Sequence, residues 1–284
     1  MTLSDHGGLA MNGVAHMLIA QITDLHLRPH GKPAIRVVET NMLAKRAVAA
    51  LMALDPRPDV VLVTGDVVNN GGPDEYETAR RVLQRFPMPV YVVPGNHDHR
   101  ENFREALRRF PGVTSHPRFV QYAIEDYPLR LIGLDTHIPN SSAGELCEER
   151  LAWLDKTLAA ARSKPTLLFM HHPPFDCGIR HMDKIRLING AEKLEAIVRA
   201  NPQVKALTFG HHHRPIETLF GGALASIAPG VAHQVELDLR PGDHDGLLVM
   251  EPTAYRLWMW DDERLVSHMG YVERFPGPFP FIED

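Results

Sequence analysis

The hydrophobic positions of this chain form short continuous runs, and longer amphipathic stretches separate them. The runs are rich in Val, Ile and Leu, which is typical of buried β-strands. They lie at 17–22, 60–63, 90–93, 130–134, 166–170 and 205–209. Between them, apolar residues recur at helical spacing and predict helices at 101–109, 148–162 and 191–198. Two further helices are expected, one capped by Thr40 and one beginning at Pro73. This alternation predicts an α/β fold.

The pattern changes after about residue 214, where the segments become shorter and turns more frequent. Trp258 and Trp260 alternate within 256–260, which predicts a strand with one buried face. Phe and Pro alternate in the tail at 275–281, and its prolines exclude a regular helix or a central strand. We expect this tail to lie on the body of the protein or on a neighbouring subunit.

Polar and ionisable residues follow directly after five of the predicted strands, each after a different one. They are Asp24 and His26, then Asp66, then Asn96, His97 and Asp98, then His171 and His172, and finally His211, His212 and His213. The carboxyl ends of strands in an open α/β sheet converge on one crevice. Imidazole and carboxylate groups there favour Zn, Fe, Co or Mn over Mg and Ca. The pattern therefore predicts a pair of divalent metal ions, which can clamp the attacking and leaving oxygens of an in-line displacement.

The spacing within these motifs supports the same hypothesis. Asp24 and His26 stand two residues apart, as do His211 and His213, so in extended chain each pair points to one side. Glycines at 65, 95 and 210 allow the backbone to turn sharply just before a ligand. Each motif alone also fits an ordinary polar loop, and a histidine run can arise by chance. The ordered set of all five is what favours a metal centre.

These motifs resemble the signature of the calcineurin-like metallophosphoesterases, which is Asp-x-His, Gly-Asp, Gly-Asn-His-Asp, His and Gly-His-x-His. Within that family the chain is most similar to bacterial class III cyclic-nucleotide phosphodiesterases and related glycerophosphodiesterases, through 65–69, 170–174 and 229–234. The resemblance implies a four-layer α/β/β/α sandwich. We expect an N-terminal extension at 1–16, a catalytic domain at 17–235, and a C-terminal segment at 236–284 that contacts another subunit or covers the active site.

The resemblance also implies roles for individual residues. Asp24, His26 and His213 would hold one metal, Asn96, His171 and His211 the other, and Asp66 would bridge both. His97 would face the phosphate as a catalytic residue, and Asp98 would orient a nearby histidine. Asn69, His97 and His233 would bind substrate. His172 and His212 are left outside the ligand set, because adjacent residues tend to point apart.

The activity implied is hydrolysis of a small phosphodiester, a 3',5'-cyclic nucleotide or a glycerophosphodiester, by in-line attack of a metal-bridging hydroxide. We rank cyclic nucleotides first. A phosphomonoesterase or pyrophosphatase on the same metal pair is an alternative, although no dedicated basic cluster for the added charge stands beside the motifs. A non-catalytic metal-binding scaffold is a second alternative, although no ligand position is substituted.

The composition excludes several classes of binding partner and location. A net charge of −5 argues against a nucleic-acid polymer as partner. No apolar run approaches the roughly 18 residues that a transmembrane helix requires, and residues 1–16 lack the features of a secretory signal. Cys147 and Cys177 are the only cysteines, which favours a reducing cytoplasm. We expect a cytoplasmic homo-oligomer with no membrane partner.

Overall fold

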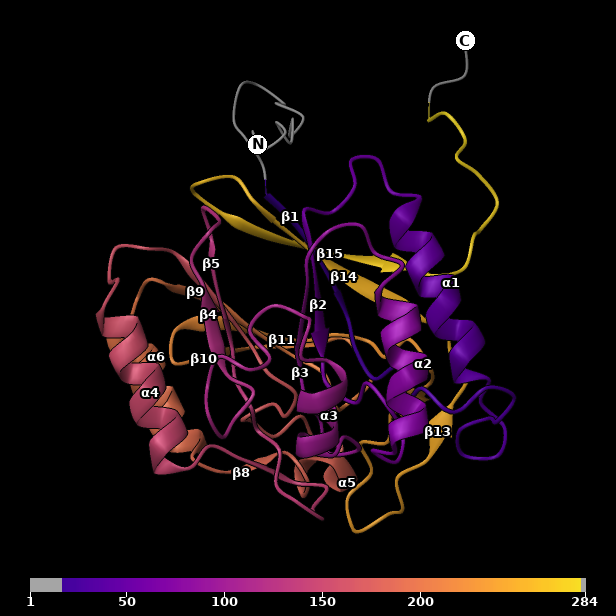
Figure 1. The fold of residues 1–284 in the computed structure, drawn as a ribbon, viewed down its shortest axis with the longest axis horizontal. Coiled ribbons are helices and arrows are strands. Elements are labelled where there is room, and N and C mark those ends of the chain that lie inside the picture. Colours follow the sequence, from indigo (N-terminus) through magenta and orange to yellow (C-terminus); the bar gives the residue numbers. More distant parts are fainter. Residues whose placement is uncertain (1–16, 282–284) are drawn as a thin grey trace.

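Two β-sheets pack face to face, and helices cover their outer faces (Figure 1). The computed structural model describes residues 17–281. The predicted N-terminal extension at 1–16 lies outside the described residues. The four layers confirm the expected α/β/β/α sandwich.

The first sheet has the strand order β15-β14-β1-β2-β3. Strands β1, β2 and β3 are parallel to one another, whereas β14 runs antiparallel to β1 and β15 antiparallel to β14. The bounds are β1 Met17–Ile22, β2 Val60–Thr64, β3 Val90–Val93, β14 Ala254–Trp260 and β15 Leu265–Tyr271.

The second sheet has the order β10-β11-β9-β7-β5-β4, with parallel pairing from β11 through β9 and β7 to β5. Its bounds are β4 Tyr122–Ile124, β5 Arg130–Gly133, β7 Thr166–Phe169, β9 Val204–Phe209, β10 Ile216–Phe220 and β11 Ala223–Ile227. Two small strand pairs lie outside the sandwich. They join β6 Gly144–Glu145 to β8 Leu187–Asn189, and β12 Gln234–Val235 to β13 Leu248–Val249.

Helices bury one apolar face against each sheet. The helices are α1 Thr40–Met52, α2 Pro73–Leu83, α3 Arg100–Ala106, α4 Glu148–Ala159, α5 Arg180–Asp183 and α6 Ala191–Ala200. Residues of α1 and α2 join the core of the first sheet, and residues of α4 and α6 join a separate cluster against the second sheet. The predicted period-3.6 pattern therefore marked the buried faces of these helices.

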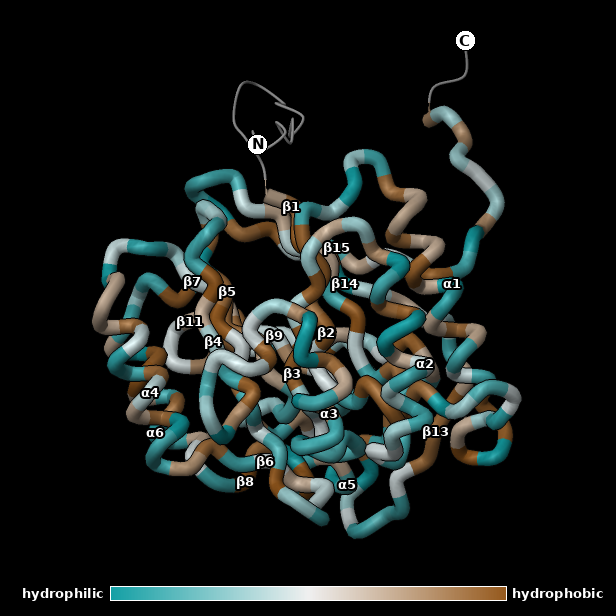
Figure 2. Tube along the Cα trace, viewed as in Figure 1, coloured by the Kyte–Doolittle hydropathy of each residue, from teal (hydrophilic) through white to brown (hydrophobic). Residues whose placement is uncertain are grey.

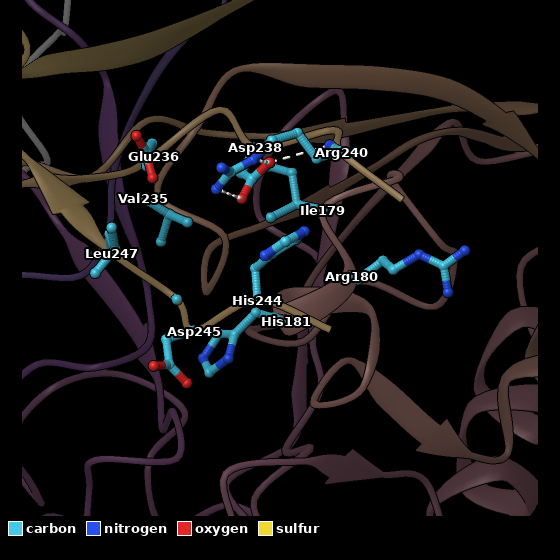
Figure 3. Close-up of a pocket in the computed structure, with 11 residues that line it drawn as sticks. Ile179, Arg180, His181, Val235, Glu236, Asp238, Arg240, His244, Asp245 and Leu247 are labelled. Carbon is cyan, nitrogen blue, oxygen red and sulfur yellow. Dashed lines mark hydrogen bonds and ion pairs between the residues drawn. The ribbon is translucent and has the colours of Figure 1, made fainter. Parts of the chain in front are cut away.

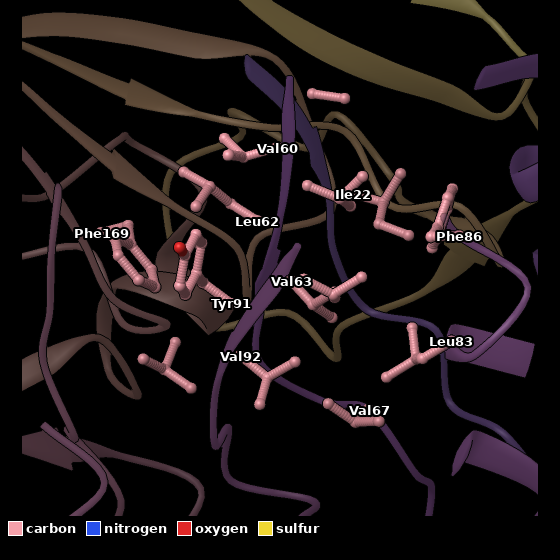
Figure 4. Packing of buried hydrophobic residues seen from close by; sticks show 14 of the residues in the cluster. Ile22, Val60, Leu62, Val63, Val67, Leu83, Phe86, Tyr91, Val92 and Phe169 are labelled. Carbon is pink, nitrogen blue, oxygen red and sulfur yellow. The ribbon is translucent and has the colours of Figure 1, made fainter. Parts of the chain in front are cut away.

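The space between the sheets is filled mainly by aliphatic and aromatic side chains, including Leu62, Tyr91 and Phe169 (Figure 4). One buried polar residue, Gln21, crosses this layer. Its amide donates to Thr64 Oγ1 and to the Phe209 carbonyl, both at 3.0 Å, and its Oε1 accepts from Trp258 Nε1 at 3.2 Å. These bonds satisfy a polar group that would otherwise cost about 1–3 kcal/mol in the core, and they tie the two sheets together.

Several local expectations need correction. Thr40 is the first residue of α1 rather than its cap, and its buried hydroxyl has no partner among the described residues. The helix expected at 101–109 ends at Ala106. The tail does not lie on the body, because Phe275, Phe279 and Phe281 are 58%, 76% and 107% exposed. A contact of this tail with a neighbouring subunit stays a prediction. Among the helices of residues 17–281, none has the length and apolar character that a bilayer crossing requires.

Candidate metal centre

The loops that follow the parallel strands carry the predicted ligands to one place. Asp24, His26, Asp66, His211 and His213 all have left-handed backbone, with φ between 44° and 72°. Residues other than glycine rarely adopt this conformation, and such strain clusters at functional sites. Strands β1, β2 and β9 therefore each end in a tight turn that carries a predicted ligand.

The three glycines leave room that a side chain would fill. Gly65 has a φ of 95° and makes the sharp turn that was expected. Gly65 also permits close approach, as Gly95 and Gly210 do: a Cβ would lie 2.3 Å from His171 Nδ1 at Gly65, 2.1 Å from Asp66 Oδ1 at Gly95 and 2.0 Å from Thr23 Oγ1 at Gly210. The backbone next to the ligands is therefore packed too tightly for a side chain at any of the three positions.

Four of the predicted ligands form the first group. Asp24, His26, Asp66 and His213 place one ligand atom each within 4.8 Å of all the others, and all four are buried. His213 Nε2 lies 3.2 Å from Asp24 Oδ1 and 3.2 Å from His26 Nε2. His26 Nε2 lies 3.7 Å from Asp66 Oδ2. This set of two imidazoles and two carboxylates has the size and composition of a metal site.

The second group lies on the other side of Asp66. His171 Nε2 is 3.4 Å from Asp66 Oδ2 and 3.0 Å from Asn96 Oδ1. The rings of His171 and His211 have centroids 5.0 Å apart. Asp66 Oδ2 thus stands between the two groups, as a bridging ligand must. The structure brings all seven predicted metal ligands together.

Backbone carbonyls fix which imidazole nitrogen carries the proton. His171 Nδ1 lies 2.8 Å from the Thr64 carbonyl and His213 Nδ1 lies 2.9 Å from the His233 carbonyl. A nitrogen that faces a carbonyl must donate, so in the neutral ring each Nε2 carries the lone pair that a metal ion can take. These lone pairs face other acceptors, including Asn96 Oδ1 and Asp24 Oδ1. Such converging groups repel one another unless a proton or a metal ion lies between them, and the residues therefore fit a pair of divalent metals.

The pKa shifts of the site residues agree with a site that binds cations. Burial alone would raise the pKa of Asp66, but His171 and His97 hold the pKa well below its usual value. Burial lowers the pKa of His211, and the neighbouring His172 lowers it further. Burial would also lower the pKa of His171, but the Asp66 carboxylate outweighs burial and raises that pKa to about 9. The site therefore presents a carboxylate that stays ionised and attracts whichever cation is available.

The predicted substrate residues surround the first group. His97 has an exposed ring whose Nδ1 lies 2.8 Å from the Asn69 carbonyl, and its centroid is 4.7 Å from that of His26. Asn69 donates its side-chain amide to Asn70 Oδ1 at 2.8 Å. His233 is buried, stacks at 4.5 Å on His213, and has an Nδ1 with no partner among the described residues.

Asp98 does not orient a histidine through its carboxylate. Its oxygens accept from the backbone N–H groups of Gly95 and Val67, at 2.9 and 3.2 Å, and from Tyr76 Oη at 3.0 Å. Burial raises the pKa of Asp98 to about 7, and the nearby Asp66 charge adds to this effect. Asp98 therefore joins the loop after β3 to the loop after β2, and its influence on the metals passes through the backbone.

Some hydrogen-bond partners of the predicted ligands could not be predicted from the sequence. The carbonyls of Thr64, Ile185 and His233 orient His171, His211 and His213. Backbone carbonyls have no residue-type signal, so only the fold reveals them. Thr136 Oγ1 binds His172 Nδ1 at 2.7 Å, which aims a buried Nε2 toward the second group.

A segment of the C-terminal region braces this arrangement. Residues 235–247 and 179–181 line a small pocket, in which Arg240 and Asp238 pair (Figure 3). Gly246 packs so closely on the His181 ring that a Cβ there would lie 2.3 Å from it. The loop that carries α5 continues to Ile185, whose carbonyl lies 3.0 Å from His211 Nε2. The segment therefore supports a loop that orients a predicted ligand.

Comparisons with known proteins agree with the geometry. Residues 17–215 match the family described as Calcineurin-like phosphoesterase. A probable glycerophosphodiester phosphodiesterase GpdQ from Arcobacter nitrofigilis is 38% identical over 269 residues, which cover 94% of this chain and 98% of that protein. A probable cyclic nucleotide phosphodiesterase from Rhodopseudomonas palustris is 37% identical over 281 residues, covering 94% and 97%.

A solved structure of a dimetal phosphatase from Danio rerio shares the fold with a TM-score of 0.61, at 18% identity, and covers 88% of this chain and 98% of its own. The chain belongs to the calcineurin-like phosphoesterase family, whose members use a dinuclear metal centre.

Proposed function

We propose that this protein hydrolyses small phosphodiesters with a pair of divalent metal ions. One observation carries the proposal: imidazole and amide acceptors converge on both sides of Asp66 Oδ2, which lies 3.7 Å from His26 Nε2 and 3.4 Å from His171 Nε2. In this assignment Asp66 would bind both metals. Asp24, His26 and His213 complete one site, and Asn96, His171 and His211 complete the other.

Bound metals supply a water of lowered pKa and neutralise charge on the phosphoryl oxygens. The chain's own residues position the substrate beside them. His97 projects its free Nε2 into solvent-accessible space next to His26, because the Asn69 carbonyl holds its Nδ1. There it can donate a proton to the departing alkoxide or stabilise a non-bridging oxygen. His233 also lies beside His26, with ring centroids 5.4 Å apart.

The substrate class follows from charge and from the relatives. A phosphodiester carries one negative charge, and the two relatives above are named for glycerophosphodiesters and cyclic nucleotides. His97 and His233 lie against the first metal group, and neither is a permanent cation of the kind that a doubly charged monoester favours. We therefore propose a small phosphodiester over a phosphomonoester. Mn, Fe, Co or Zn suits the nitrogen and oxygen ligands, and a cytoplasmic homo-oligomer remains our expectation.

A substrate panel on metal-stripped protein tests the proposal. The protein is reloaded with Mn, Fe, Co or Zn, and turnover is measured on cyclic AMP, glycerophosphocholine, bis(p-nitrophenyl) phosphate and p-nitrophenyl phosphate. We expect turnover of the diesters to exceed that of the monoester and to require about two metal equivalents per chain. A dominant monoester activity would reject the substrate class, and two bound metals without any turnover would favour a binding protein.

Asp66→Asn tests the assignment of Asp66 as a ligand of both metals, and Asp74→Asn is its control. Asp66→Asn keeps the shape of the side chain but removes the bridging charge, so we expect fewer bound metals and a loss of nearly all turnover. Asp74 is an exposed carboxylate in the first turn of α2, so its substitution should change neither. Wild-type turnover by Asp66→Asn with two metals bound would contradict the ligand assignment.

A further inference from the structure

One edge of the first sheet ends in a long strand with an open side. Strand β15 pairs with β14 over seven consecutive residue pairs without a register shift. It is the outermost strand of that sheet, and no described residue pairs with its other side. Its sequence, LVSHMGY, contains no charged residue and no proline. Met269 and Tyr271 are 41% and 47% exposed.

The other edges of the two large sheets are protected in ways that β15 is not. Strand β3, at the opposite edge, is fully buried, and its Val92 carbonyl accepts from Tyr122 Oη at 2.7 Å. Strand β4 has only three residues. Strand β10 carries a charge at Glu217. Short length, covering groups and charges are the usual means by which proteins prevent edge-to-edge association, so the bare β15 edge indicates a partner strand.

The register of β15 shows which backbone groups are free. Val272 N donates to the Thr253 carbonyl at 2.9 Å, and Asp261 N donates to the Arg264 carbonyl at 3.2 Å. Hydrogen-bonded and non-hydrogen-bonded pairs alternate in an antiparallel ladder. Even-numbered residues from Arg264 to Val272 therefore direct their N–H and C=O groups to β14. Leu265, Ser267, Met269 and Tyr271 direct theirs outward.

These four outward residues are placed symmetrically about His268. An antiparallel copy of the same strand, rotated about a two-fold axis through His268, would pair Leu265 with Tyr271 and Ser267 with Met269. Every outward N–H and C=O would then find a partner, and the two five-stranded sheets would become one continuous sheet. A self-complementary patch of this kind is what an isologous two-fold interface requires.

We propose that β15 is a homodimer interface, in which two copies of this chain pair through their β15 edges with His268 on the two-fold axis. The same geometry predicts where the C-terminal tail would lie in the dimer. Tyr271 of one copy would lie opposite Leu265 of the other, so residues 272–281 would run onward over the partner subunit. The ring of Phe275 already packs on Tyr271, with centroids 5.5 Å apart. A partner surface would bury Phe279 and Phe281, which are 76% and 107% exposed. The tail that carries them extends away from the body of the single chain (Figure 2).

Light scattering of the full chain with variants at Met269 tests the pairing. We expect a wild-type mass of twice 31.8 kDa. Met269→Pro removes an outward N–H but no bond to β14, and Met269→Lys places a charge on the edge. Each should weaken the dimer roughly 100-fold, while turnover on bis(p-nitrophenyl) phosphate is kept. Met269→Leu, which retains the N–H and the apolar side chain, should stay dimeric. A monomeric wild type, or an unchanged mass in both the proline and lysine variants, would overturn the proposal.

Cysteine cross-linking tests the register. In a background with Cys147 and Cys177 replaced by Ser, His268→Cys would face its own copy in a non-hydrogen-bonded pair, about 4.5 Å apart at Cα. Such a pair can close a disulfide, so oxidation should give a reductant-sensitive covalent dimer. Leu219→Cys, which is 75% exposed on the β10 edge, is the control and should stay monomeric on denaturing gels. Faster cross-linking at Leu219 than at His268 would show that a different edge associates.

Discussion

The ring of His97 is exposed, whereas the imidazoles around it are buried. Its Nδ1 is held by the Asn69 carbonyl at 2.8 Å, so its Nε2 alone faces the substrate space. We predict that His97→Ala lowers kcat for glycerophosphocholine by about 10²–10⁴-fold, the range for loss of one acid–base group. Metal content, measured by elemental analysis, should not change. The loss should be smaller for bis(p-nitrophenyl) phosphate, because p-nitrophenolate leaves without a proton.

His99→Ala is the control for this residue. It lies in the same loop and is also exposed, but its Nδ1 accepts only a long bond of 3.4 Å from Asn102 N at the start of α3. Its removal should leave kcat within about threefold of the wild-type value, since a weak cap contributes little. A loss of metal in His97→Ala would instead make His97 a ligand, which would contradict its assigned role.

At the scale of the elements, the loops after the strands hold their ligands in strained backbone. His213 has a φ of 51°, a conformation that glycine adopts without strain and residues with a Cβ do not. We predict that, in chelator-treated protein, His213→Gly is more stable than His213→Ala by about 1 kcal/mol, the usual size of such strain. Urea unfolding at pH 7 measures the difference.

At Thr218 we expect the opposite order of stability between the glycine and alanine variants. It lies exposed in β10, where the backbone is extended. There, Thr218→Gly should be less stable than Thr218→Ala by about 0.5–1 kcal/mol, because glycine loses more conformational freedom on folding. The same order at both positions would show that strain at His213 is not the cause.

The elements also show what the sequence could predict. Apolar runs marked the central strands within a residue or two, and the residues following them marked the ligands, because parallel strands end at one edge. The contacts of the Asp98 carboxylate were not predicted, because they are mostly with backbone N–H groups, which leave no pattern in side-chain types. Strands β10, β11 and β15 were missed although each forms a hairpin with a strand next to it in sequence. Their residues mix polar and apolar types, without the continuous apolar runs that marked the central strands.

At the scale of the whole molecule, the metal centre depends on the position of one sheet relative to the other. Ligands after β1, β2 and β3 belong to the first sheet, and ligands after β7 and β9 to the second. A shift between the layers would therefore separate His26 from His213 and Asn96 from His171. The buried Gln21 network joins the two sheets directly, and the ion pair between Arg100 and Asp135 joins α3, which follows β3, to the loop after β5.

The ion pair of Asp135 can be tested through the pH dependence of the free energy of unfolding. It follows β5, is fully buried, and accepts from Arg100 Nε at 2.7 Å and from Val120 N at 2.9 Å. Burial would raise the pKa of Asp135, but Arg100 outweighs burial and holds it below the usual value. A lowered folded-state pKa contributes stability above the unfolded pKa of about 3.9, and that stability is lost as pH falls through the folded pKa.

We therefore predict that Asp135→Asn lowers the free energy of unfolding by about 3 kcal/mol at pH 7, because it leaves the Arg100 charge buried without its partner. The difference from wild type should shrink below about pH 4, where the unfolded wild-type chain begins to bind a proton at Asp135 that the folded chain does not. Urea unfolding at pH 7 and pH 3 measures both values. Asp176→Asn is the control, since its pair with Arg186 is exposed and should be worth at most about 1 kcal/mol. An equal loss for Asp135→Asn at both pH values would mean that the carboxylate charge does not hold the sheets together.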